Sequence, residues 1–387
     1  MNRQNRHSFP KWIWAIIPLI LLAGLIALFF ATDPLSPLGV TSPPVEEVTV
    51  ERTTMNDEGI HLLVRANGSE PVQIAQVHVD GAFWEFTKEP EGAMGRLSTA
   101  TIHIPYPWVK DELHEITIIT HTGATFHHTI EIAGPTPEWT GQRVLAYILL
   151  GIYIGVIPVG LGLLFYPFLK SLGAGGLQFL LTLTMGLLVY LLFDTMLEGM
   201  EIAEQAAGAF EANVLVWLAA GLSFLIIFGI GRRGGKAPEG LSLATYLALG
   251  IGFHNLGEGL AVGAAMASGQ AALGSFLVVG FTLHNITEGI GIAAPIVKRK
   301  TGFFTFLWLT LLAGLPASAG TLIGAFSYSP HWSVILFGIG AGAILQVLVE
   351  VWTWLNRESK TPFTATNLAG FILGIALMYG TALLVSV

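Results

Sequence analysis

Two six-residue stretches decide how this sequence is interpreted. His254–Gly259 reads H-N-L-G-E-G and His284–Gly289 reads H-N-I-T-E-G, so a His-Asn-x-x-Glu-Gly pattern occurs twice, 30 residues apart. Each copy lies near the middle of an apolar stretch of the length that crosses a bilayer as a helix. Residues four apart on a helix project from the same face. Each copy therefore predicts one imidazole and one carboxylate on one side of a membrane helix.

The composition around these stretches is typical of a membrane protein. Of 387 residues, 53% are hydrophobic and only 11% are charged, and the mean hydropathy is +0.66. An average soluble domain carries about 25% charged residues. We predict nine spans, at residues 12–30, 144–165, 177–199, 213–231, 241–267, 271–297, 302–326, 332–355 and 366–386. The last eight follow one another through short loops and should form one bundle (143–387), while the first stands apart.

The basic residues predict the orientation of the spans, because cytoplasmic loops retain Lys and Arg. Counting alternately from a cytoplasmic N-terminus, the inside segments hold Arg3, Arg6, Lys11, Lys170, Arg232, Arg233, Lys236, Lys298, Arg299, Lys300, Arg357 and Lys360. The outside loops after residue 143 hold none. This pattern predicts a multi-pass protein of the plasma or inner membrane, with residues 32–142 and the C-terminus extracytoplasmic. Residues 1–31 are interpreted as a basic tip and an uncleaved anchor, with a cleaved signal peptide as the alternative.

Residues 45–134, reached through a Pro-rich linker at 32–44, have a different composition. Runs of β-branched residues at 60–64, 72–79, 99–104, 116–121 and 125–132 are separated by turn signals such as Asn67-Gly68, Asp80-Gly81 and Thr122-Gly123. They predict an extracytoplasmic all-β domain, an immunoglobulin-like antiparallel sandwich. Trp84 and Trp108 are expected in its core. Seven of the eleven His lie here, but the adjacent His127 and His128 must face opposite sides of a strand, so no metal cluster is predicted.

Three function classes are disfavoured by what the sequence lacks. It has no cysteine, which excludes disulfides, Cys-ligated zinc and a thiol nucleophile. The net charge of −8 argues against a nucleic-acid partner. No Gly-x4-Gly-Lys-Ser/Thr run occurs, which argues against an ATP-driven pump.

Ionisable residues inside membrane spans are costly and mark functional sites by default. Consecutive spans run antiparallel, so the two motif faces can meet at mid-membrane, which would bring together the side chains of His254, Glu258, His284 and Glu288. Imidazole with carboxylate suits Zn, Fe, Mn or Ni better than Cu(I). Asn255 and Asn285 can add carbonyl oxygens or orient the carboxylates. The alternative is that these polar groups only hold two helices together by hydrogen bonds.

Three further acids predict a transport path through the bundle. Asp194 and Glu198 lie four apart toward the outer end of their span, and Glu350 lies toward the inner end of another. An entrance, a centre and an exit would then all be lined by carboxylates. The alternative is that these are interfacial residues whose side chains reach water.

The paired motifs on consecutive helices, the second continuing as Ile290-Gly-Ile-Ala-Ala-Pro295, resemble those of the ZIP family of divalent-metal transporters. The resemblance covers about 143–387. It implies a dimeric transporter with a binuclear centre between its fourth and fifth helices, moving Zn(II), and often Fe(II) or Mn(II), toward the cytoplasm. By position, His254, Glu258, His284 and Glu288 match one metal site. Asn255 and Asn285 match contributors to the second site, and Glu350 matches an acid on the seventh helix.

This sequence departs from the family pattern at three positions. Gly257 and Thr287 stand where the family usually has Pro before each motif Glu, and Ala317 stands where its sixth helix often carries an acid. Ala317 is therefore expected to leave a gap in the second metal site.

The function predicted from these observations is transport of divalent transition metal, Zn(II) first, without ATP, by a homodimer with no prosthetic group and no enzymatic activity. A membrane-embedded metallohydrolase using the same His/Glu site is the alternative, although no His-Glu-x-x-His occurs. A third hypothesis is a metal sensor that signals through the outer domain, but no cytoplasmic output domain supports it.

Overall fold

The computed structural model describes residues 11–32, 45–235, 237–268, 270–358 and 364–383. The chain divides into two compact units, Met1–Val45 and Glu46–Val387. The first unit contains α1 (Lys11–Thr32), an apolar helix whose described Leu and Ile side chains are exposed. Arg3, Arg6, residues 33–44 of the linker, Lys236 and Lys360, on which parts of the sequence interpretation rest, lie outside the described residues.

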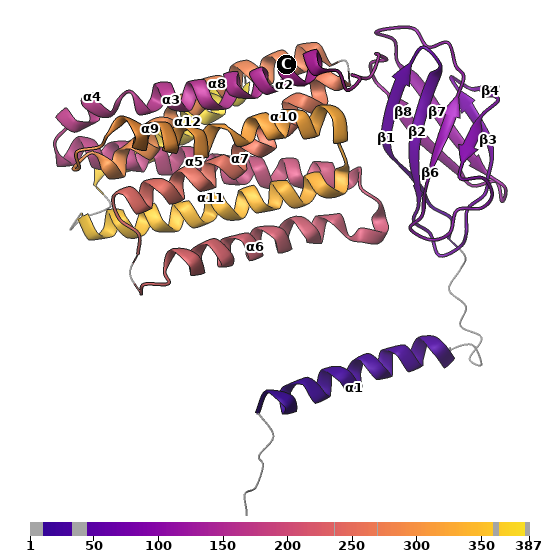
Figure 1. The fold of residues 1–387 in the computed structure, drawn as a ribbon, viewed down its shortest axis with the longest axis horizontal. Helices are drawn as coiled ribbons and strands as arrows, with labels where there is room; N and C mark the ends of the chain where they lie inside the picture. Colours follow the sequence, from indigo (N-terminus) through magenta and orange to yellow (C-terminus); the bar gives the residue numbers. More distant parts are fainter. Residues whose placement is uncertain (1–10, 33–44, 236, 269, 359–363, 384–387) are drawn as a thin grey trace, which may run out of the picture. The chain divides into compact units, whose positions relative to one another are not determined.

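The second unit begins with eight strands in two four-stranded antiparallel sheets (Figure 1). Their bounds are β1 (Val48–Asn56), β2 (Gly59–Ala66), β3 (Ile74–Val79), β4 (Ala82–Trp84), β5 (Thr87–Glu89), β6 (Thr99–Ile104), β7 (His114–Thr120) and β8 (Thr125–Ile130). One sheet has the order β1-β2-β6-β5 and the other β4-β3-β7-β8. This arrangement confirms the predicted β-sandwich.

Alternating apolar residues build the core of the sandwich. Ile60, Leu62 and Val64 of β2 are fully buried and pack with equally buried residues of β6 and β7, such as Ile102 and Ile116. Trp84 and Trp108 are partly buried against this core, as expected. The sequence interpretation omitted β1, β4 and β5. The β1 segment V-T-V-E-R-T-T-M-N carried a usable signal, because β-branched residues dominate it.

The helical part of the second unit follows the predicted spans closely. It comprises α2 (Gly141–Gly151), a π-helical segment η2 (Ile152–Val156), α3 (Ile157–Leu163), α4 (Tyr166–Ser171), α5 (Ala174–Glu204), η3 (Gly208–Phe210), α6 (Ala212–Gly231), α7 (Leu241–Ala267), α8 (Ala271–Ala293), η4 (Ala294–Ile296), α9 (Phe303–Gly314), α10 (Pro316–Ser327), α11 (Pro330–Glu358) and α12 (Ala365–Leu383). Seven helices in the described residues are long and apolar enough to cross a membrane. With α1 and the two sheets, they confirm the predicted fold class.

Helix α7 is not among those seven, although its 27 residues would extend about 40 Å. It carries the polar His254, Asn255 and Glu258, and it is packed among α8, α9, α10 and α11. A helix shielded in this way needs less apolar surface than one that faces lipid. The packing of α8, α9, α10 and α11 around α7 therefore explains how a helix with these polar residues can lie inside the bundle.

Two spans are interrupted next to α7 and α8. The π-helical η2 joins α2 to α3, and the span predicted at 302–326 breaks at Leu315 into α9 and α10. Pro316 explains the second break, because it has no N–H to donate to the carbonyl one turn earlier. π-helical segments frequently occur at functional sites.

Small residues bring the backbones of the motif helices close to their neighbours. A Cβ on Gly259 of α7 would lie 2.1 Å from the Ala317 carbonyl oxygen of α10, and one on Gly320 would lie 2.1 Å from that of Leu256. A Cβ on Gly289 of α8 would lie 2.2 Å from the Val159 carbonyl oxygen of α3. Small interfacial residues permit such close packing between membrane helices. The glycines of the motifs thus fix where the polar side chains stand.

This packing predicts that Gly259→Ala destabilises the purified chain, because the methyl group would overlap backbone atoms of α10. Overpacking typically costs about 1–3 kcal/mol. Gly221→Ala on α6 is the matched control, since nothing lies within 4 Å of its added Cβ and the change favours a helix. The thermal midpoint in detergent should fall for Gly259→Ala and not for Gly221→Ala; equal midpoints would contradict this packing.

His128 gives the sandwich a predictable pH dependence. Burial lowers the pKa of His128 below its ordinary value of 6.5, and its Nε2 lies 2.8 Å from Thr53 Oγ1. Below about pH 6.5 the unfolded chain takes up this proton more readily than the folded one. The stability linked to His128 is therefore complete above that pH and decreases as the pH falls.

We expect His128→Gln to reduce the loss of amide-exchange protection in β1 and β8 between pH 7 and pH 5. The same substitution at the exposed neighbour His127 is the control, because it should leave the loss unchanged. An identical pH response in the parent and His128→Gln would show that burial of this imidazole is not the cause.

Candidate metal centre

Three motif side chains converge between α7 and α8. One ligand atom each from His254, Glu258 and His284 lies within 4.8 Å of the other two. Nε2 of His254 is 3.0 Å from Glu258 Oε1, and Nε2 of His284 also hydrogen-bonds to this oxygen. All three residues are buried, with exposed fractions of 6%, 3% and 6%. Two imidazoles thus point at one carboxylate oxygen inside the bundle.

The two motif asparagines are held by the interrupted helices. Asn255 Nδ2 donates to the Ala313 carbonyl oxygen at 3.0 Å, just before the break between α9 and α10. Asn285 Nδ2 donates to the Ile154 carbonyl oxygen of η2 at 2.8 Å, and to Glu258 Oε2 at 3.1 Å. Because each amide nitrogen is used as a donor, the orientation of each Oδ1 is fixed. The asparagines therefore connect the irregular backbone to the centre.

Four buried oxygens near the centre have no hydrogen-bond partner in the described part of the chain: Asn255 Oδ1, Asn285 Oδ1 and both carboxylate oxygens of Glu288. Glu288 is only 2% exposed and interacts electrostatically with His254, Glu258 and His284. A buried acceptor without a partner costs about 1–3 kcal/mol, more when it is charged. Acceptor oxygens of this kind are the ligands that a cation would use.

Thr195 belongs to this site, although the sequence interpretation did not include it. Its Oγ1 on α5 lies 3.0 Å from Nδ1 of His254, and Thr195 is 2% exposed. A metal-binding imidazole commonly donates its other N–H to an oxygen, which fixes the ring and its tautomer. The only sequence signal was a threonine beside Asp194 in an apolar span, which is too common to select it. Thr195 thus leaves Nε2 of His254 free to face the centre.

Among the described residues, this is the one group of three or more His, Cys, Asp or Glu arranged closely enough to hold a metal ion. Two imidazoles, carboxylates and amide oxygens form a mixed nitrogen and oxygen donor set. That set suits first-row divalent ions such as Zn, Fe and Mn and disfavours Cu(I).

Residues 233–382 match the family model of the ZIP zinc transporters. The chain contains a ZIP-family domain. No curated protein matches the chain. The family implies divalent-metal transport by a multi-pass membrane protein, and its members are transporters rather than enzymes. The His/Glu centre of the ZIP domain is compatible with that activity.

Ala317, which was expected to leave the second metal site short of one ligand, lies among apolar groups. Ala317 is fully buried, and its Cβ lies 2.8 Å from where a Cβ on Gly155 would stand. The Ala317 methyl group packs with Ile154 and Val262. Apolar packing therefore fills the space in which the family often has an acid.

The two acids predicted at the entrance lie in different surroundings. Asp194 is exposed in a groove of about 270 Å³, lined by Tyr190, Phe193 and Leu197 of α5 and by Ile375 of α12. It directly precedes Thr195, so it stands level with His254 rather than near the outer end of its helix. Glu198, one turn further along α5, lines a larger cleft instead.

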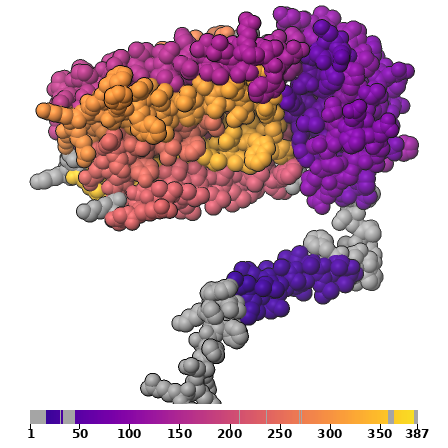
Figure 2. Space-filling view, in the orientation of Figure 1, coloured from indigo at the N-terminus to yellow at the C-terminus, as the bar shows by residue number. Residues whose placement is uncertain are grey.

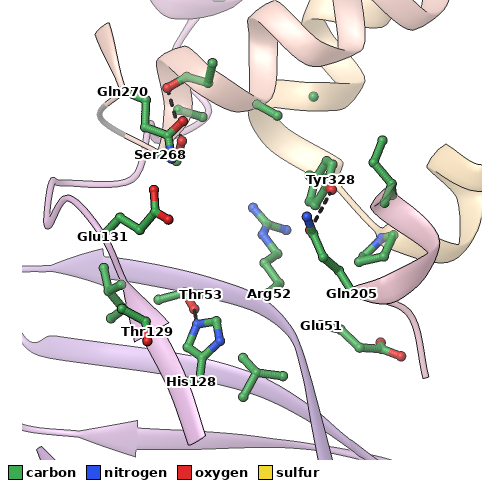
Figure 3. Close-up of a pocket in the computed structure, with 18 of the residues that line it drawn as sticks. Glu51, Arg52, Thr53, His128, Thr129, Glu131, Gln205, Ser268, Gln270 and Tyr328 are labelled. Atoms are coloured by element: carbon green, nitrogen blue, oxygen red, sulfur yellow. Dashed lines mark hydrogen bonds between the residues drawn. The ribbon is translucent and has the colours of Figure 1, made fainter. Parts of the chain in front are cut away.

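That larger cleft, of about 960 Å³, lies between β1 and β8 of the sandwich and the ends of α5, α7, α8 and α10 (Figure 3). Figure 2 shows the sandwich directly against this end of the bundle. The contacts include an ion pair of Glu51 with His331 at 3.5 Å and Arg65 over the Phe210 ring at 5.6 Å. Acidic side chains dominate the charged lining of the cleft: Glu51, Glu131, Glu198, Glu201 and Glu204, with Arg52 among them.

Within the described residues, the sandwich histidines are not part of a group arranged closely enough to hold a metal ion. His61 and His103 stack across β2 and β6, with ring centroids 4.4 Å apart. Burial and the nearby His103 lower the pKa of His61, with Glu58 opposing them. His127 and His128 bond to different threonines, Thr117 and Thr53.

The contact of Thr195 with His254 predicts that Thr195→Val weakens metal binding by about 10- to 100-fold, the usual effect of losing a hydrogen bond to a ligand. Thr182→Val is the matched control, because that hydroxyl donates to Gln178 and Phe179 carbonyls of its own helix. Zinc affinity of the purified variants, measured by titration, checks this. Equal affinity of Thr195→Val and the parent would remove Thr195 from the centre.

Proposed function

We propose that this protein carries divalent transition-metal ions, Zn(II) first and Fe(II) or Mn(II) as alternatives, toward the cytoplasm without ATP. In this proposal His254, Glu258, His284 and Glu288 bind the ion, and Asn255 and Asn285 contribute amide oxygens. The observation that carries it is the set of buried acceptor oxygens without partners around two imidazoles. A substrate cation would supply these oxygens with the partner that the described residues do not provide.

The same observation argues against a purely structural role for the motif. Polar residues that only hold helices together are expected to satisfy one another's hydrogen bonds. Here neither Glu288 oxygen has a hydrogen bond of ordinary geometry within the described residues, although the side chain is almost fully buried and Asn255 lies near it. Leaving a buried carboxylate unpaired is strongly destabilising, whereas a bound divalent cation compensates its charge. The motif is therefore better explained by cation binding.

The direction of transport is inferred from the distribution of charge. One end of the bundle, here named the basic end, carries Lys170, Arg232, Arg233, Lys298, Arg299, Lys300 and Arg357. Contacts hold these segments together, such as the bond from Tyr166 to the Arg299 carbonyl and that of Arg357 with Glu239 at 2.8 Å. Since cytoplasmic segments retain basic residues, the basic end is assigned to the cytoplasm and the sandwich to the outside.

A path through the bundle follows from this orientation. The acidic cleft under the sandwich raises the local concentration of cations, and its lining includes Glu198. The centre lies further along, with Asp194 beside it, and Glu350 lies at the basic end on α11. We propose that the ion passes these groups in that order. A homodimer is the proposed assembly, as the family implies.

The decisive test is metal uptake into proteoliposomes that contain the purified chain, with Zn, Fe, Mn, Co, Ni and Cd each at limiting concentration. His254→Ala and Glu258→Gln should abolish uptake, because removing one member leaves the others buried and unpaired, at a cost of about 3–5 kcal/mol. His121→Ala, at an exposed position of the sandwich, is the control and should transport normally.

Unchanged uptake by a folded His254→Ala protein would overturn the assignment of the centre. No uptake of any metal by the parent chain, together with metal-dependent hydrolysis that Glu258→Gln abolishes, would favour the metallohydrolase alternative instead.

A further inference from the structure

Two buried polar residues of α11, Gln346 and Glu350, here named the strip on α11, lie between the level of the metal centre and the basic end. At Gly340, an added Cβ would lie 3.5 Å from the His254 Cα. Gln346 and Glu350 follow about 9 Å and 15 Å further along the helix, as six and ten residues imply. They lie four apart, so they project from one face. Both are buried, at 0% and 1% exposure.

Gln346 is a second buried polar group whose bonding capacity is unused. Neither its Oε1 nor its Nε2 has a hydrogen-bond partner in the described residues. Close contacts place it between two helices: Gly342 packs on Ala220 of α6, whereas Val347 packs on Gly250 of α7. A buried amide of this kind is costly unless it binds something. Gln346 therefore offers an amide oxygen between the centre and Glu350.

Glu350 is already occupied by a cation of the protein itself. Arg232, the residue that follows α6, donates Nε to Glu350 Oε1 and Nη2 to Glu350 Oε2, both at 3.1 Å. Its Nη2 also donates to Thr353 Oγ1 at 3.4 Å, and its guanidinium lies 4.4 Å from the centroid of the Phe228 ring. This bidentate ion pair uses both carboxylate oxygens and is stronger than a pair joined by one hydrogen bond.

The two partners differ in their access to water. The Glu350 side chain is 0% exposed, whereas that of Arg232 is 32% exposed. Arg232 is followed by Gly234 and Gly235, the latter with a φ of 70° that favours glycine. The guanidinium can therefore move into solvent while the carboxylate stays in the bundle. When it does so, Gln346, Glu350 and Thr353 present four or more oxygen lone pairs to any other cation.

We propose that Arg232 is a tethered cation that closes the exit of the transport path by occupying Glu350, and that the transported divalent metal must displace it. The exit site consists of Gln346 Oε1, the Glu350 carboxylate and Thr353 Oγ1, and it takes the same class of ion as the centre. This rests on the proposed function, which makes the strip on α11 part of an ion path. Arg232 bonds to both Glu350 oxygens, so a metal ion that takes up this carboxylate must break at least one of those bonds, which couples exit of the metal to release of Arg232.

The first test measures closure without any metal. The chain contains no cysteine, so Gln346→Cys introduces a single thiol. A small, positively charged thiol reagent should modify it slowly in the parent background and at least about tenfold faster with Arg232→Gln, because the closing group is lost. Arg233→Gln makes the same charge change one residue away and should leave the rate unchanged. Equal rates in all three backgrounds would overturn the proposal.

The second test counts bound metal in the full chain with Gln346 intact. Zinc titration in detergent should give one more bound ion per chain for Arg232→Gln than for the parent. The additional ion should be lost in the double variant Arg232→Gln, Glu350→Gln, which removes both charges together. Arg232→Lys keeps the positive charge but loses the planar guanidinium that bonds to both carboxylate oxygens. Its thiol modification rate and its zinc binding should lie between those of the parent and of Arg232→Gln.

Arg232→Lys also keeps the proposal testable if Arg232→Gln does not fold. If Arg232→Gln is not recovered as a folded protein, parent-like thiol modification and parent-like metal binding by Arg232→Lys would overturn the proposal. Failure of the proposed function has a different signature, namely no metal uptake by the parent chain itself. A parent that transports zinc, combined with unchanged thiol rates and unchanged metal count in Arg232→Gln, would reject only the role of Arg232.

Discussion

The arrangement of the bundle depends on one constraint: two imidazoles and two carboxylates must be held inside a medium that solvates charge poorly. Glu258 bonds to both His254 and His284, which reduces the cost of its own burial. Glu288 has no comparable partner in the described residues. The bundle is stable enough to keep this group buried because the surrounding helices pack backbone against backbone through Gly259, Gly289 and similar positions.

The interruptions in the neighbouring helices belong to the same arrangement. Regular helices use their carbonyl oxygens internally and offer nothing to an adjacent side chain. The π-helical η2 and the break at Leu315 instead leave carbonyls, those of Ile154 and Ala313, that the motif asparagines can bind. Irregular backbone at membrane depth is tolerated where a partner is available. Asn255 and Asn285 are such partners, and their own oxygens remain available for the substrate.

The membrane spans and the His and Glu residues of the centre could be predicted from the sequence, because their signals were local. Twenty-residue apolar runs define spans, and a four-residue spacing of His and Glu defines one face of a helix. Thr195, Arg232 and Gln346 were not singled out, because their roles depend on contacts across 59 or more residues or on the lack of any contact. The packing around Ala317 could not be predicted for a similar reason: the room at that position depends on how closely Gly155 approaches.

The centre and the proposed exit differ in how their carboxylates are neutralised. At the centre, Glu258 is paired with imidazoles, whose nitrogens can exchange a proton for a metal and remain as ligands. At the basic end, Glu350 is paired with a guanidinium, which stays charged and cannot become a ligand. An ion can therefore join the first pair but must separate the second. In the proposed path, a centre that accepts the ion, followed by a site that must be opened, would let the protein hold the ion before releasing it.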